Sequence, residues 1–284
     1  MQSLWMIVAS FCFACMGVCV KLAADDFSAP EIVFYRSAIS LCFMFALMRL
    51  RGVPIATPHW RFQLQRATSG FFSLLLYFYA IALLPLATAV TLSYTSPLFL
   101  ALYLVWFGGQ RLRGGMLGAL LLGFVGVVLL LRPTLHADQL VGGLVGLGAG
   151  ILAGLAYYNV RELGARGETE SRTVFYFSLL STVASVPWMA VQGFHAVDLR
   201  SGLLLLGVGV FATLAQLAMT RAYRRGKTLV AASLAYSTVV FASLFGMLFW
   251  AEKLSPEAWL AIGLIVASGM AASRFSRANP AEQD

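Results

Sequence analysis

The sequence predicts an all-α integral membrane protein with ten transmembrane helices, arranged as two inverted five-helix repeats. Of its 284 residues, 60% are hydrophobic and only 11% are charged, whereas about a quarter of the residues of a soluble domain are charged. Apolar stretches of about 20 residues, the length that crosses a bilayer as a helix, recur along the whole chain. A nine-residue phrase of the first half returns in the second half.

The ten expected spans are the apolar runs bounded by charged residues, Pro or Gly. They cover residues 4–21, 30–49, 66–84, 87–107, 114–131, 143–161, 172–192, 202–221, 228–250 and 256–273. Two starts are well marked, because Ser28 and Glu31 have the spacing of a capping box and Pro256 stands at a first helical position. The first span lacks a basic start and a cleavage site, so we expect it to remain as a membrane helix.

The loops between these spans carry Lys and Arg very unequally. Fifteen of these residues, Arg61 and Arg66 among them, lie on the side of the chain ends, and four lie on the opposite side. Because cytoplasmic loops carry the excess of positive charge, we expect both termini in the cytoplasm and the protein in the inner (plasma) membrane. The net charge of +8 then reflects topology and does not indicate a nucleic-acid partner.

The repeated phrase is TLSYTSPLF at 91–99 and SLAYSTVVF at 233–241, at a constant offset of 142 residues. Each half holds five helices, an odd number, so the second half enters the membrane upside down relative to the first. Such an inverted repeat suits alternating access around a site near the midplane. We divide the chain into a first repeat (1–133), an external loop (134–142), a second repeat (143–273) and a cytoplasmic tail (274–284).

Two segments, RATSGFFSLLLYFYAIALLPLATAVTLSYTSPLF at 66–99 and WAEKLSPEAWLAIGLIVASG at 250–269, together with the two five-helix halves, resemble the drug/metabolite transporter superfamily and its EamA-type exporters. The resemblance covers nearly the whole chain. It implies export of amino acids or related small carboxylate-bearing metabolites. Uptake of a nucleoside-like or vitamin-like metabolite, of the S-adenosylmethionine or riboflavin class, and multidrug export are alternatives. The first half departs from the family pattern at Gln110, whereas the equivalent residue of the second half, Glu252, agrees with it.

Arg36 is the sharpest single signal, because it lies about 9 Å inside the second expected helix. A charge at this depth is costly unless it is paired, hydrated or extended to the interface. Its guanidinium is expected to meet an anionic substrate group in bidentate fashion, or else to hold helix ends together. No Asp, Glu or His lies well inside any span, which disfavours a cation/proton exchanger.

The repeated phrase supplies further candidates, since equivalent residues of helices four and nine face each other in an inverted repeat. Tyr94, Thr95, Tyr236 and Ser237 would form a largely apolar pocket with a few hydroxyl groups, or they pack helix against helix. Polar groups elsewhere in the spans share these two interpretations. The substrate-binding set is therefore Arg36, Tyr77, Tyr79, Tyr94, Thr95, Tyr157, Asn159, Gln216, Tyr236 and Ser237.

Two local features bear on helix geometry. Pro97 removes a backbone hydrogen bond in the first copy of the phrase only, which predicts a kink in helix four and a straighter helix nine. Glycines recur every four residues at Gly146, Gly150 and Gly154, and also at Gly114 and Gly118. Small residues at this spacing predict close packing between helices.

Several functions lack their sequence signature. There is no phosphate loop for ATP drive, and no intramembrane Ser–Lys, paired-Asp or HExxH constellation. We therefore expect no enzyme and no cofactor, with an intramembrane enzyme as a remote alternative. The four cysteines are expected to be reduced and to pack between helices, not to bind a metal. The expected partners are a small-molecule substrate and the lipid bilayer; a monomer suffices, and a dimer is compatible with ten helices.

Overall fold

The chain is an all-α integral membrane protein. The computed structural model describes residues 2–110, 114–133, 139–251 and 253–277, and every regular element in these ranges is helical. The elements are η1 (Gln2–Leu4), α1 (Trp5–Ala23), α2 (Ala29–Leu50), α3 (Trp60–Leu83), α4 (Leu86–Ser93), α5 (Ser96–Trp106), α6 (Gly114–Leu131), α7 (Leu140–Ala165), α8 (Glu170–Gln192), α9 (Leu199–Arg225), α10 (Thr228–Ala235), α11 (Ser237–Trp250) and α12 (Pro256–Arg277). They form ten apolar segments of membrane-spanning length, which confirms the ten expected spans.

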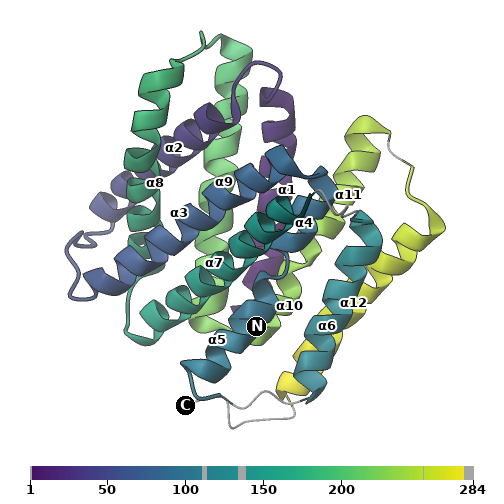
Figure 1. The fold of residues 1–284 in the computed structure, drawn as a ribbon. Helices are drawn as coiled ribbons and strands as arrows, with labels where there is room; N and C mark the ends of the chain where they lie inside the picture. The colour runs from purple at the N-terminus through teal and green to yellow at the C-terminus, as the bar shows by residue number, and fades with distance from the viewer. Residues whose placement is uncertain (1, 111–113, 134–138, 252, 278–284) are drawn as a thin grey trace.

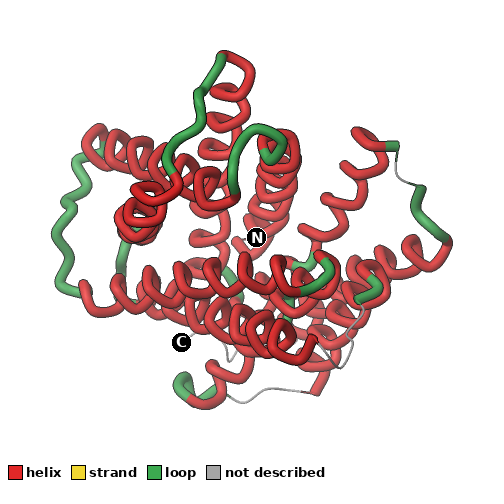
Figure 2. Tube along the Cα trace, turned by 45° about the horizontal axis from the view of Figure 1, so that its top comes forward, coloured by secondary structure: helices red, strands yellow, loops and turns green. Residues whose placement is uncertain are grey.

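The helices pack in pairs that connect the two halves of the chain. Helix α3 lies along α7, α1 along α9, α2 along α8 and α6 along α12 (Figure 1). Short loops join the ends of the helices (Figure 2). If the halves are exchanged, span by span, the α3–α7 pair becomes the α9–α1 pair, and the other two pairs map onto themselves. The packing therefore has the pattern that a two-fold repeat requires, while the opposite membrane direction of the halves stays a prediction.

Both copies of the repeated phrase are interrupted at the same place. The fourth span breaks at Tyr94 and Thr95, between α4 and α5, and the ninth span breaks at Tyr236, between α10 and α11. Pro97 predicts an interruption of the first copy only, and the structure corrects this. The second copy has no Pro, but its hydroxyl groups of Ser237 and Thr238 donate to the carbonyls of the preceding turn. Such bonds compete with the helical ladder.

The glycine spacing of α7 is confirmed as a close-packing face. A Cβ atom on Gly154 would lie 2.9 Å from Phe99 Cβ and 3.0 Å from the Ser96 carbonyl oxygen. Gly146 and Gly150 approach the same broken span in the same way. Since a helix side chain would not fit there, these glycines let α7 reach the backbone of α4 and α5.

On α6 the expected pair of glycines makes no such approach. A Cβ on Gly114 or Gly118 would meet nothing within 4 Å, so the equal spacing there does not mark an interface. The close approaches come from two other glycines: a Cβ on Gly123 would lie 2.6 Å from the Tyr236 ring, and a Cβ on Gly126 would lie 2.8 Å from Ile265. Glycine spacing alone does not tell which face of a helix meets a neighbour.

Replacing Gly154 with Ala is expected to destabilise the protein by about 1–3 kcal/mol, because the new methyl group overpacks a backbone contact. Gly118→Ala is the matched control: it has open space and gains helix propensity, so its stability should be unchanged or higher. Thermal midpoints of the two variants in one detergent test this. Equal shifts in both variants would contradict the close packing of α7.

Glu31 does not form the capping box predicted with Ser28. Its carboxylate is fully buried and accepts a hydrogen bond from the backbone N–H of His195 at 2.9 Å. The same carboxylate lies 2.7 Å from His195 Nδ1. The segment before α9 thus brings two nitrogen atoms of His195 to this carboxylate. A capping box would bring only one backbone N–H. Ser28 still occupies the N-cap position of α2.

The remaining correspondences at the ends of the spans are mixed. Helix α12 begins at Pro256, as predicted. Helix α3 begins at Trp60, six residues before the expected start at residue 66, and this places Arg66 inside the helix. Glu252, residues 134–138 of the expected external loop and residues 278–284 of the expected tail lie outside the described residues.

Candidate functional site

The two breaks bring together the tyrosines of the repeated phrase. The ring centroids of Tyr94 and Tyr236 are 6.2 Å apart, so the two residues face each other as the repeat predicts. The hydroxyl of Thr238, two residues after Tyr236, donates to the Ala235 carbonyl at 2.9 Å. The hydroxyls of Thr95 and Ser237 likewise donate to carbonyls of their own spans, at 2.6 Å and 2.5 Å. These two hydroxyls shape the breaks.

A second aromatic pair lies beside the first. The rings of Tyr157 on α7 and Tyr223 on α9 are stacked, with centroids 5.1 Å apart and an interplanar angle of 20°. Tyr223 is close enough to both Tyr157 and Tyr236 for their phenol groups to interact electrostatically. Sequence reasoning missed Tyr223, because the expected eighth span ended at residue 221, whereas α9 continues to Arg225.

Arg36 lies inside α2, in the third turn of the helix, and faces the interior. Its Nε is buried and has no hydrogen-bond partner, and the described part of the chain offers it no carboxylate within ion-pair distance. The side chain keeps part of its surface accessible, although it lies between packed helices. This cation is thus neither paired nor held to a helix end.

Arg66 is the functional candidate that the sequence analysis missed. It was counted among the loop arginines, but it lies in the second turn of α3 and is only 3% exposed. Its Nη2 donates to Gln216 Oε1 of α9 at 3.3 Å, and its guanidinium carbon lies 4.5 Å from the centre of the Phe177 ring of α8. Its Nε is buried without a partner.

A signal for Arg66 was present in the sequence. Gln63, Arg66, Ser69 and Ser73 recur at helical spacing, and all four are buried in the structure. A polar stripe of this kind places Arg66 on the inner face of a helix, not in a loop. Without Arg66 the basic residues on the expected cytoplasmic side number fourteen instead of fifteen, so the predicted orientation is unaffected.

The two arginines belong to one site. The Ser178 hydroxyl of α8 donates to Ser40, one turn after Arg36 on α2, at 3.0 Å, and the neighbouring Phe177 ring lies 4.5 Å from the guanidinium carbon of Arg66. Gly70, one turn after Arg66, provides the necessary room. A Cβ there would collide with Arg66 Nη1 and would lie 3.1 Å from the Phe177 ring.

The acidic residues in the described chain are engaged elsewhere or exposed. Glu31 binds His195, Glu162 pairs with two arginines, and Glu168 pairs with Arg172. The other described acidic residues are Asp25, Asp26, Glu170, Asp198 and Glu257, which are exposed or partnered at helix ends. The site is therefore cationic without an internal counter-ion.

The remaining predicted residues divide into two groups. Tyr77 lies near Tyr94, and Gln216 contacts Arg66, so both join the site. Tyr79 is 61% exposed and points away from the interior. Asn159 is buried, but two residues along a helix turn its side chain to the face opposite Tyr157. The structure thus assembles Arg36, Arg66, Tyr77, Tyr94, Tyr157, Gln216, Tyr223 and Tyr236.

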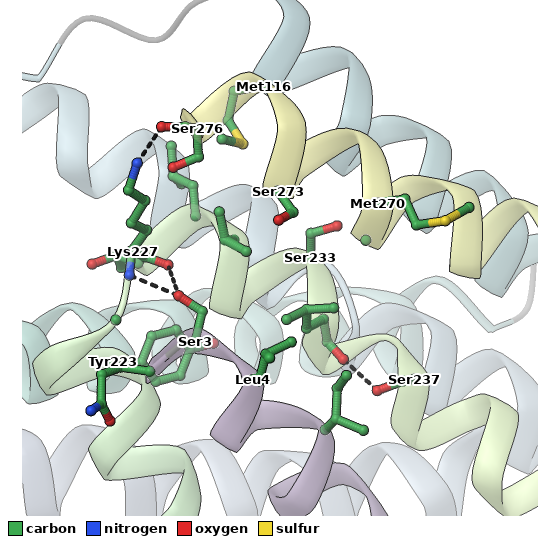
Figure 3. A pocket seen from close by; sticks show the side chains of 18 of the residues that line it. Ser3, Leu4, Met116, Tyr223, Lys227, Ser233, Ser237, Met270, Ser273 and Ser276 are labelled. Atoms are coloured by element: carbon green, nitrogen blue, oxygen red, sulfur yellow. Dashed lines mark hydrogen bonds between the residues drawn. The ribbon is translucent and has the colours of Figure 1, made fainter. Parts of the chain in front are cut away.

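A cavity of about 1800 Å³ opens beside this group (Figure 3). It extends from the turn between α9 and α10 to Ser237 and Phe241 of α11. Tyr223 lines it, and the same ring stacks on Tyr157. The tyrosine pair therefore borders the cavity at Tyr223. Ser237, a predicted site residue, borders this cavity.

The mouth of the cavity is basic. Among the described residues that line it, five carry positive charge and none carries negative charge: Arg161, Arg224, Arg225, Lys227 and Arg274. Arg224 and Arg225 pair with Glu170, and Arg161 pairs with Glu162. Lys227 is tied to the Ser276 carbonyl and, through its backbone N–H, to Ser3 (Figure 3). These contacts hold the basic side chains of the mouth in place.

Comparisons with known proteins agree with this architecture. The model of the EamA-like transporter family matches residues 1–132 and again residues 140–273. The chain is 36% identical over 273 residues to the pseudopaline exporter CntI of Pseudomonas aeruginosa, with 95% of each chain covered. It is 22% identical over 272 residues to a riboflavin transporter of Brucella anthropi, covering 93% of this chain and 95% of that relative.

The fold also has a solved counterpart. A crystal structure aligns with a TM-score of 0.86 at 19% sequence identity, covering 96% of this chain and 98% of the other, and this likeness concerns the fold alone. The family match covers both halves, and the exporter is related over the whole length of the chain. This multi-pass membrane transporter belongs to the EamA-like transporter family of the drug/metabolite transporter superfamily.

Proposed function

We propose that this transporter exports a small carboxylate-bearing metabolite across the inner membrane by alternating access, without ATP. The observation that carries the proposal is Arg36, a cation inside the bundle with no partner in the described chain. A buried charge of this kind is costly unless another group pairs with it. A substrate carboxylate supplies that group, and the planar guanidinium suits bidentate binding.

The direction of transport is supported by a relative. The pseudopaline exporter CntI is related over 95% of this chain, so export is the first direction to test. The cavity supports it as well, because it opens at the end that the loop charges predict to be cytoplasmic. A carboxylate-bearing solute of the cytoplasm would enter past a basic mouth whose described lining residues include no carboxylate.

A second candidate function is uptake or exchange of a flat-ringed vitamin-like metabolite. The 22% identical riboflavin transporter favours it, and so do the stacked rings of Tyr157 and Tyr223. Planar ligands bind between aromatic side chains through apolar contact. In this function Arg36 would serve an accessory anionic group or none, and the tyrosines would carry recognition.

Arg36→Gln is expected to lower carboxylate exchange at least about tenfold, because it removes a charge-assisted contact. The measurement is counterflow in proteoliposomes preloaded with unlabelled amino acids, organic acids, nucleosides or riboflavin. Tyr94→Phe and Tyr236→Phe report on the aromatic pair. Tyr79→Phe is the matched control, since Tyr79 is 61% exposed on the outside, and it should transport as the wild type does.

Elution profile and thermal midpoint show whether each variant is folded. Carboxylate exchange that persists in a folded Arg36→Gln variant would make Arg36 structural. Riboflavin exchange that depends on the tyrosines but not on Arg36 would favour the second candidate function.

A further inference from the structure

We propose that Arg66 is a second anion-binding position beside Arg36, so that the site takes a substrate with two acidic groups. This inference rests on the proposed function, because it specifies the substrate of the same site. Its chemical class is a dicarboxylate or an amino acid with an additional acidic group. A monocarboxylate would neutralise only one of the two guanidinium groups.

The charge balance is the first argument. Arg66 is only 3% exposed, and Arg36 lies one turn before Ser40, which bonds to Ser178 beside the Phe177 ring that packs on Arg66. Two cations in a low-dielectric interior repel each other, and no carboxylate in the described chain pairs with either. One bound carboxylate would leave a net positive charge between the helices, whereas a dianion neutralises both guanidinium groups.

The geometry of Arg66 is the second argument. Phe177 lies 4.5 Å from its guanidinium carbon, and Gln216 receives its Nη2 at 3.3 Å. These contacts fix the plane of the guanidinium. A planar, fixed fork presents its remaining donors in the arrangement that matches a carboxylate. Gly70 is the residue that leaves space at Nη1.

A purely structural arginine would have its donors satisfied. Arg66 touches α8 and α9 through Phe177 and Gln216, as a structural residue would, but its Nε is buried without a partner. Arg36 has the same unsatisfied atom. Unsatisfied buried donors are costly, and two in neighbouring guanidinium groups point to one ligand that supplies acceptors to both.

The cavity supplies a route to this pair. Tyr223 lines the cavity and stacks on Tyr157 at 5.1 Å, and Tyr157 lies within electrostatic range of Arg66. A rearrangement of this one stacked pair would connect the basic cavity with the arginines. The phenol of Tyr157 would then adjoin the second acidic group.

The test is counterflow in proteoliposomes with two matched pairs of labelled probes: succinate against butyrate, and glutamate against glutamine. The wild type is expected to exchange the diacid of each pair at least about tenfold faster than its partner. Arg66→Gln should reduce diacid exchange at least about tenfold more than monoacid exchange, so that the preference disappears.

Arg66→Lys guards against a variant that fails to fold. It keeps the charge and loses the fork, so it should weaken the diacid preference without abolishing it. Equal exchange of mono- and diacids by the wild type would overturn this inference and leave the proposed function intact. Equal loss of both probes in a folded Arg66→Lys variant would also overturn it, because a structural role predicts that result. If no carboxylate of either kind exchanges, both proposals fail together.

Discussion

Gln216→Glu is expected to reduce exchange of acidic substrates about 100-fold while the fold keeps its stability. The substitution is nearly isosteric, and it places a carboxylate oxygen where Gln216 Oε1 now accepts from Arg66 Nη2 at 3.3 Å. This internal carboxylate pairs with the buried guanidinium. It neutralises the positive charge that would otherwise bind the acidic group of the substrate. Losses of this size are typical when one partner of a close charge pair is taken away.

Stability separates this expectation from a general disturbance. Arg66 is already buried, so the new carboxylate supplies a partner to an existing charge and does not create an unpaired one. The thermal midpoint should therefore equal that of the wild type or exceed it. A substitution that only damaged packing would lower transport and midpoint together.

Gln216→Met is the matched control for this variant. It keeps the volume of the side chain and removes the acceptor, but it adds no charge. Its transport should fall by about tenfold, well short of the loss in Gln216→Glu, since a hydrogen bond from a charged guanidinium to a neutral amide contributes about 1.5 kcal/mol. Counterflow of succinate and thermal midpoints in detergent give both readouts. Full activity in Gln216→Glu, or equal losses in the two variants, would show that the charge of Arg66 does not serve the substrate.

The fold was largely predictable because its main determinant is simple. A membrane helix must bury about 20 apolar residues, and this signal is visible in the hydropathy of the chain alone. The meeting of Tyr94 and Tyr236 was predictable for a different reason: a repeat relates equivalent residues by symmetry. Neither inference depends on the rotation of an individual helix.

The predictions about the site that were wrong depend on the rotation of individual helices and on the positions of helix ends. Tyr77 and Tyr79 are two residues apart, and only the first lies toward the site, which composition does not reveal. The expected spans are bounded by the apolar runs of the sequence. The apolar run of the third span begins later than helix α3, so the sequence places Arg66 in a loop. Trp60 and the polar stripe from Gln63 continue α3 beyond the apolar run. The sequence therefore hides this candidate residue among the polar residues that extend a membrane helix beyond its apolar run.

The break in the ninth span shows a related limit. Pro97 is visible in the sequence as a helix breaker, whereas Ser237 and Thr238 act through bonds to the carbonyls of Leu234 and Ala235. Hydroxyl residues make such bonds in intact helices too, so their presence does not predict a break. The site therefore combines the two repeated segments with two arginines. The sequence predicts the meeting of the repeated tyrosines in full, but it predicts only one of the two arginines, Arg36.

Glu168→Gln is expected to destabilise the fold by about 2–3 kcal/mol, because it removes a buried charge that joins the two halves. The carboxylate accepts hydrogen bonds from Thr57, from Gln63 at 3.3 Å and from Arg172 at 2.7 Å. The side chains of Glu168 and Arg172 are only 2% and 12% exposed. Gln63 lies one turn before Arg66 on α3, so this network also holds the helix that carries the second arginine.

The pH dependence of stability identifies the charge as the cause. Burial acts to raise the pKa of Glu168, but the bonds from Thr57, Arg172 and Gln63 outweigh it and leave the pKa below the ordinary value of 4.5. A carboxyl whose pKa is lowered by folding stabilises the protein above its unfolded pKa and loses this contribution as the pH falls through the folded value. The difference in thermal midpoint between wild type and Glu168→Gln should therefore be full at pH 7 and should shrink below about pH 4.5. Glu257→Gln is the matched control, because its ion pair with Arg132 is exposed and exposed pairs contribute little. A Glu168→Gln deficit that stayed constant across this pH range would mean that shape, not charge, holds the two halves together at this end.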